Sequence, residues 1–189
     1  MSFGTVWVIA VLLGAPAFEG FKESSCPTGP ILWRGLSGEE VAWAAQELPR
    51  AAARVAEKLG WACEAPFTAV LVPDRSEMRR FLERFDAASS STRGALGVAI
   101  PSLRILVVRW DHVYPSESLA ETLCHEVAHI TLHPTDSSAI PRWLDEGAAQ
   151  WASGRRLTPD QLSYLAFLSR IGGLYPLESM ERVFPTPHE

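Results

Sequence analysis

The chain has 189 residues, enough for one domain with a proper core, and its composition of 47% hydrophobic and 21% charged residues is that of a globular protein. Its formal net charge is −5. Binding to a phosphate backbone needs a basic face, whereas Lys and Arg form only short pairs here, such as Arg79-Arg80 and Arg155-Arg156, so the composition argues against a nucleic-acid partner.

The first residues have the pattern of an export signal. An apolar run from Val6 to Leu13 is followed by Ala15-Pro16-Ala17, a small-residue cleavage pattern. We therefore interpret residues 1–17 as a signal peptide, which predicts a secreted or periplasmic protein. No Lys or Arg precedes the run, which leaves a misassigned start codon, a weak signal or an uncleaved N-terminal membrane anchor as alternatives, besides an amphipathic or buried first strand. No other stretch is long enough to cross a bilayer, so no stable membrane span is expected after signal cleavage.

The rest of the chain is expected to form a single domain over residues 37–189, preceded by an irregular lead-in over residues 18–36, which carry several Gly and Pro. Ser37 and Glu40 form a capping-box pattern that predicts the start of a helix. Pro49 is expected to kink or divide this helix, with a second segment, Ala51–Leu59, that ends at Gly60. The other predicted elements are strand Phe67–Val72, a helix from Asp74 to about Phe85, strands Gly97–Ile100 and Arg104–Arg109, and helices over 117–132, Arg142–Ser153, Thr158 to about Ile171, and within Pro176–Phe184.

The predicted helix over 117–132 contains an H-E-x-x-H segment, from His125 to His129. Two His four residues apart lie on the same helix face, so both imidazoles can reach one metal ion. Glu126 lies about 100° round the helix from His125, which suits a hydrogen bond to a metal-held water better than ligation. A catalytic zinc needs three protein ligands and an open position, and Glu146 in the next predicted helix is the candidate third ligand.

The two segments HEVAHITLH and PRWLDEGAAQWASG resemble the gluzincin clan of zinc metallopeptidases, in particular the small bacterial peptidase MA-like domains. The resemblance covers roughly residues 65–155. It implies an α+β, thermolysin-like zincin fold, with a small twisted sheet packed on the HExxH helix and a helical C-terminal part. It also implies that His125, His129 and Glu146 bind Zn²⁺ and that Glu126 is the general base. Members of this family usually continue with at least one more helix, which this chain, ending at Glu189, does not reach.

The function implied by this resemblance is zinc-dependent hydrolysis of peptide bonds in a peptide or protein substrate. Two alternatives stay open: a catalytically inactive, zinc-stabilised binding or assembly module, and a zinc amidase that acts on a non-protein substrate. No fourth Cys or His stands at an obvious position, which favours an open, catalytic site. In this family the strand nearest the active site pairs with extended substrate, and either Gly97–Ile100 or Arg104–Trp110 is expected to be that strand.

Neighbours of the motif offer further candidates. Asp145 either orients His125 or His129 or simply suits the helix dipole. His133 continues the four-residue series, but on a helix it lies about 12 Å along the axis from His125. We therefore expect His133 to serve the helix C-terminus and not the metal. The candidates for stabilising an oxyanion are Tyr164, Tyr175 and Arg142.

The three cysteines and two tryptophans carry weaker signals. If the protein is exported, Cys26 and Cys63 could form a disulfide. Cys124 is expected to be a small buried residue and not a ligand. Trp143 and Trp151 are expected in the core.

Overall fold

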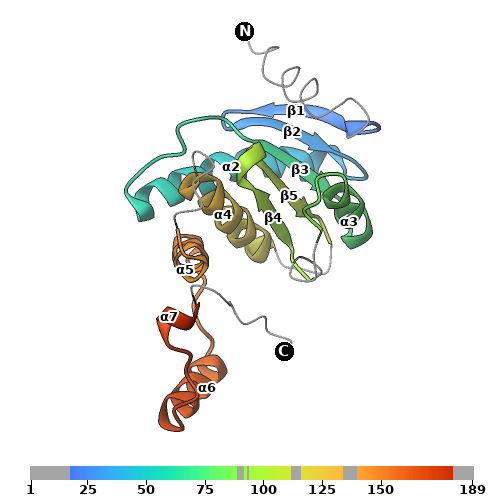
Figure 1. The fold of residues 1–189 in the computed structure, drawn as a ribbon. Helices are drawn as coiled ribbons and strands as arrows, with labels where there is room; N and C mark the ends of the chain where they lie inside the picture. Colours follow the sequence, from blue (N-terminus) through green and yellow to red (C-terminus); the bar gives the residue numbers. More distant parts are fainter. Residues whose placement is uncertain (1–17, 89–91, 93, 112–115, 134–139, 181–189) are drawn as a thin grey trace.

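The computed structural model describes residues 18–88, 92, 94–111, 116–133 and 140–180. The expected signal peptide at 1–17 and the end of the predicted helix Pro176–Phe184 lie outside these residues. The described chain has a mixed α/β architecture, in which a five-stranded sheet has helices on both faces (Figure 1). Among the described helices, none combines the length and the apolar character needed to cross a membrane.

The strands of the sheet lie in the order β1-β2-β3-β5-β4. Their bounds are Lys22–Cys26 for β1, Gly29–Trp33 for β2, Thr68–Val72 for β3, Gly97–Ile100 for β4 and Ile105–Arg109 for β5. The three central strands β2, β3 and β5 are parallel, whereas β1 and β4 pair antiparallel at the two edges. Of the two segments that could have been the edge beside the HExxH helix, Gly97–Ile100 is therefore the edge strand, and β5 lies inside the sheet.

The irregular lead-in expected over residues 18–36 is wrong. This segment contains the hairpin of β1 and β2, in which Trp33 Nε1 donates a hydrogen bond to Ser24 Oγ at 3.1 Å. The strand signal is weak locally because β1 is polar and β2 contains Pro30. The hairpin is stabilised by the pairing of β2 with β3, in which Ile31 lies opposite Ala69, and not by the strand propensity of its own residues. The domain therefore begins before residue 37.

Two hydrophobic cores lie on the two faces of the sheet. In β3, Ala69 and Leu71 belong to the core beneath α2, α4 and α5, whereas Val70 and Val72 belong to the core beneath α3. This alternation follows from the two-residue period of a strand and explains why every residue of β3 is buried. The helix bounds are Gly38–Leu59 for α2, Arg75–Glu83 for α3, Ser116–Leu132 for α4 and Arg142–Ser153 for α5, and a short 3-10 helix, η2, covers Pro101–Leu103.

The predicted capping box of α2 is confirmed: Glu40 N donates to Ser37 Oγ at 3.3 Å, and Ser37 N donates to Glu40 Oε2 at 2.7 Å. The predicted division at Pro49 is wrong, because one helix runs through it from Gly38 to Leu59. A stripe of buried residues continues at helical spacing on both sides of the proline and holds both halves on the same core: Val41, Ala44, Leu48, Ala51 and Val55.

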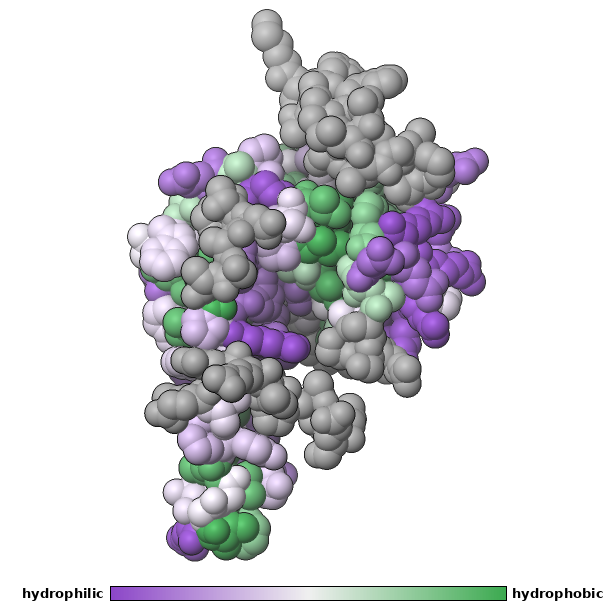
Figure 2. Space-filling model, in the orientation of Figure 1, coloured by the Kyte–Doolittle hydropathy of each residue, from purple (hydrophilic) through white to green (hydrophobic). Residues whose placement is uncertain are grey.

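Beyond α5 the chain leaves the body of the protein. Helix α6 (Pro159–Arg170), which begins with a capping box between Thr158 and Gln161, projects away from the sheet, and α7 (Leu177–Met180) follows it (Figure 1). No residue of α6 is buried, and its apolar side chains form hydrophobic patches on this projecting part (Figure 2). Trp151, expected in the core, is 56% exposed, with Lys58 Nζ 5.7 Å from its ring centroid.

Candidate metal centre

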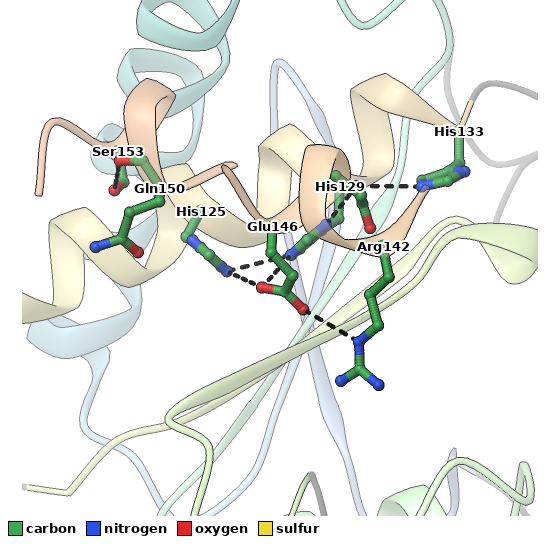
Figure 3. Close-up of polar contacts among 8 residues, drawn as sticks. His125, His129, His133, Arg142, Glu146, Gln150 and Ser153 are labelled. Carbon is green, nitrogen blue, oxygen red and sulfur yellow. Dashed lines mark hydrogen bonds and ion pairs between the residues drawn. The ribbon is translucent and has the colours of Figure 1, made fainter. Parts of the chain in front are cut away.

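Two helices bring the motif residues together. His125 and His129 lie one turn apart on α4, and α5 packs against this helix. Pro141 is the N-cap of α5, and its carbonyl accepts hydrogen bonds from the amides of Leu144 and Asp145. The first turns of α5 thereby present Asp145 and Glu146 to the histidines of α4. Figure 3 shows His125, His129 and Glu146 pointing toward one another.

The donor atoms of these three residues have the spacing that a zinc ion needs. His125 Nε2 and His129 Nε2 are 3.2 Å apart, and Glu146 Oε2 lies 3.5 Å from the first and 3.8 Å from the second. Ligands about 2.0–2.1 Å from a tetrahedral zinc are separated by about 3.3 Å. The three donors all lie within 4.8 Å of one another, and the Glu146 side chain is 34% exposed, so the group is open on one side. Two imidazoles and a carboxylate fit Zn²⁺ both in type and in spacing.

Glu126 lies apart from this group and is 6% exposed. It rests against the edge strand β4, where the backbone of Ala99 donates a hydrogen bond to its carboxylate. A Cβ on Gly97 would lie 2.6 Å from Glu126 Cγ, so this close approach requires glycine. Burial raises the pKa of the Glu126 carboxyl by more than His129 and His125 lower it.

Asp145 contacts His129, as one of the two alternatives from the sequence requires, and it also lies in the first turn of α5, as the other requires. Asp145 Oδ1 lies 2.9 Å from His129 Nδ1 and also 3.2 Å from His133 Nε2. If His129 Nδ1 carries the proton and donates it to the carboxylate, its Nε2 lone pair is left for a metal. Burial tends to lower the pKa of His129, but the hydrogen bond with Asp145 and the charges of Glu126, Asp145 and Glu146 raise it above its ordinary value.

The carboxylates on α5 are held in the ionised form. Burial tends to raise the pKa of Asp145, but its hydrogen bonds with His129 and His133 and their charges lower it. The hydrogen bond with His125 lowers the pKa of Glu146 and outweighs its burial. Negative charge at these two positions favours a dication among the three donors.

The candidate centre lies in a cleft of about 600 Å³ between β4 on one side and α4 and α5 on the other. Arg142 lies at this cleft with its Nε 4.0 Å from Glu146 Oε1 (Figure 3). Arg155 also lines the cleft and contacts Glu121 of α4, with 3.3 Å between Nε and Oε2. Among the residues the structure describes, Tyr164 and Tyr175 do not line the cleft; they are 62% and 65% exposed on the projecting part.

The sequence-predicted residues His125, Glu126, His129 and Glu146 all lie at this cleft. Sequence reasoning missed the contact of Gly97 with Glu126 and that of His133 with Asp145. The series of His at 125, 129 and 133 was a signal for the second contact. No local signal marks the first, because it joins a strand to a helix far along the chain.

The cysteines lie elsewhere. Cys26 and Cys63 are free thiols that line a second cavity, of about 560 Å³, formed by α2, the β1–β2 hairpin and the segment that precedes β3. Cys124 is fully buried, as expected, with its thiol 3.3 Å from the carbonyl oxygen of Ala152.

No protein-family model, curated protein or solved structure matches this chain.

Proposed function

We propose that this protein is a zinc-dependent peptidase of the gluzincin type, with a thermolysin-like arrangement of sheet and active-site helix. The observation that carries the proposal is the spacing of three donor atoms, 3.2, 3.5 and 3.8 Å, on His125, His129 and Glu146 beside a cleft. The buried carboxylate of Glu126, next to His125 on α4, and the position of β4 at the edge of the sheet support it further.

Zinc bound to His125, His129 and Glu146 would polarise the scissile carbonyl and lower the pKa of a water molecule. Glu126 would act as the general base, with its carboxylate accepting a proton from that water and returning it to the leaving amine. Burial raises the pKa of Glu126, which makes its carboxylate a stronger proton acceptor than an exposed one.

The position of β4 at the edge of the sheet favours a peptide as the substrate. Its partner β5 lies on one side only, and the cleft lies along its residues Gly97, Val98 and Ala99. An extended peptide can add to such an edge through backbone hydrogen bonds, which bind any sequence and hold the scissile bond along the strand. A small non-protein substrate of a zinc amidase has no extended peptide backbone that could pair with this strand.

The test is the zinc content of the purified protein, with unfolded-protein digestion measured on the same samples. The variants are Glu146→Ala and, as a matched control, Glu57→Ala, which removes an exposed carboxylate from α2. We expect about one zinc per chain and chelator-sensitive cleavage in the wild type and in the control, and loss of both in Glu146→Ala. One zinc without cleavage of any peptide would replace the proposal with the zinc-stabilised binding module, and a wild type without zinc would refute both.

A further inference from the structure

We propose that His133 is a positioning residue of the candidate metal centre, whose side chain acts on the metal ligand His129 through Asp145. This inference rests on the proposed zinc site. His133 has no donor atom within the group of His125, His129 and Glu146, so its contribution is indirect.

The geometry joins the three residues through a single oxygen atom. Asp145 Oδ1 lies 2.9 Å from His129 Nδ1 and 3.2 Å from His133 Nε2. His129 lies on the last turn of α4, and His133 directly follows its last residue, with the His133 amide donating a hydrogen bond to the His129 carbonyl at 3.2 Å. The two side chains are therefore one turn apart and reach the Asp145 carboxylate from the same side of the helix. Their side chains and that of Asp145 are 12%, 17% and 18% exposed, which shields both contacts from competing water.

The contact with His133 holds the Asp145 carboxylate in the position that its hydrogen bond with His129 requires. A carboxylate held by one hydrogen bond can still rotate about its side-chain torsions, whereas two donors that converge on one oxygen define its position. With Asp145 fixed, His129 Nδ1 has one acceptor in one direction. The Nε2 atom of His129 is then held 3.2 Å from His125 Nε2 and 3.8 Å from Glu146 Oε2.

The other histidine of the group lacks this support. His125 Nδ1 is buried and, within the described part of the chain, has no hydrogen-bond partner. The contacts from His133 through Asp145 are therefore the main orienting contacts found around the two imidazoles. Removal of the His133 side chain is expected to weaken zinc binding, because no equivalent contact at His125 replaces the one that is lost.

A role confined to the end of α4 is the competing explanation for His133, since a cationic side chain there suits the helix dipole. The two explanations differ in their dependence on Asp145. Stabilisation of the helix end would persist in a protein without Asp145, whereas a positioning effect would vanish with it.

The experiment measures the zinc dissociation constant by competition with a chelator for the wild type, His133→Gln, His133→Asn, Asp145→Ala and the double variant His133→Asn/Asp145→Ala. The amide nitrogen of Gln can take the place of His Nε2, whereas Asn is one methylene shorter and does not reach Asp145. We expect about tenfold weaker zinc binding in His133→Asn, binding close to wild type in His133→Gln, and a loss of about 10- to 100-fold in Asp145→Ala. The double variant should bind zinc no more weakly than Asp145→Ala.

Equal zinc binding by the Asn and Gln variants, or losses that multiply in the double variant, would overturn the inference. Thermal unfolding of each metal-free variant shows whether it is folded. The comparison of His133→Gln with His133→Asn is between two polar amide side chains that differ only in length. A wild type that binds no zinc would overturn the inference together with the proposed function. A wild type that binds zinc without hydrolysing peptides would refute only the proposed function, because the affinity comparison needs no catalysis.

Discussion

Gly97 and Glu126 are in such close contact that no side chain fits between them. A Cβ on Gly97 would lie 2.6 Å from Glu126 Cγ and 2.8 Å from Glu126 Oε1. Gly97 lies on the edge strand β4 and Glu126 on α4, so this contact sets how closely the helix approaches the edge of the sheet. It also determines where the carboxylate of the proposed general base lies.

Gly97→Ala is therefore expected to displace the Glu126 carboxylate and leave the donor atoms of the metal group in place. We expect hydrolysis to fall by about a hundredfold, because a shift of about 1 Å in a catalytic group has an effect of that size. Zinc content should stay at the wild-type level. Gly94→Ala is the matched control, since a Cβ at Gly94 meets no atom of the described residues within 4 Å and Gly94 lines the same cleft. Equal activities of the two variants would refute the role of this contact.

Glu126→Gln removes the proton acceptor but keeps the shape of the side chain. We expect zinc binding to persist and the turnover number to fall by about 10²- to 10⁴-fold, the usual contribution of a general base. Turnover of a peptide substrate and the zinc content of the same sample measure the two properties separately. A variant that loses its zinc would instead indicate that Glu126 supports the metal group directly.

The part of the site that could be predicted from the sequence is the part set by local geometry. The spacing of His125 and His129 is fixed by the helix itself, and the bounds predicted for α5, Arg142–Ser153, are those observed. The contact between Asp145 and His129 also appeared among the sequence-based alternatives. That Glu146 reaches the two histidines depends on how α5 packs against α4; the need for a third ligand made it a candidate, and the family resemblance implied the same residue.

The errors have tertiary causes. The hairpin over residues 22–33 has no strong strand signal of its own and is ordered by pairing with β3. Helix α2 continues through Pro49 because its buried stripe packs on one core from end to end, a contribution larger than the unfavourable effect of one proline. The contact of Gly97 with Glu126 was missed for a similar reason, since it depends on the relative position of two elements.

The N-cap of α3 predicts a measurable pH dependence of stability. Asp74 Oδ1 accepts hydrogen bonds from Ser76 N at 2.8 Å and Glu77 N at 3.0 Å. The side-chain hydrogen bond with Ser76 and the backbone hydrogen bond from Glu77 lower the pKa of Asp74 below its ordinary value of 3.8. Because the carboxylate form is the one stabilised by folding, this contribution is full above that value and is lost as the pH falls through the lower folded-state pKa.

Asp74→Ala is expected to lower the free energy of unfolding by about 1 kcal/mol at pH 7, the usual effect of removing an N-cap. The difference from wild type should shrink as the pH falls below 3.8. Urea unfolding followed by circular dichroism at pH 7, 5 and 3 measures it. Asp74→Asn is the control, because its amide oxygen still caps the helix but does not titrate in this range. A difference between wild type and Asp74→Ala that is unchanged at pH 3 would contradict the prediction.

The three thiols should react with an alkylating reagent at different rates in the folded protein. Cys26 and Cys63 are half-buried and line a cavity, whereas Cys124 is fully buried. Burial also raises the pKa of the Cys124 thiol, which lowers the fraction of reactive thiolate. Mass spectrometry of the native protein alkylated without a reducing agent should therefore show two rapid additions, with a third only after unfolding in denaturant. Cys26 and Cys63 that react only after reduction would instead reveal the disulfide expected of an exported protein, and rapid reaction of all three would contradict the burial of Cys124.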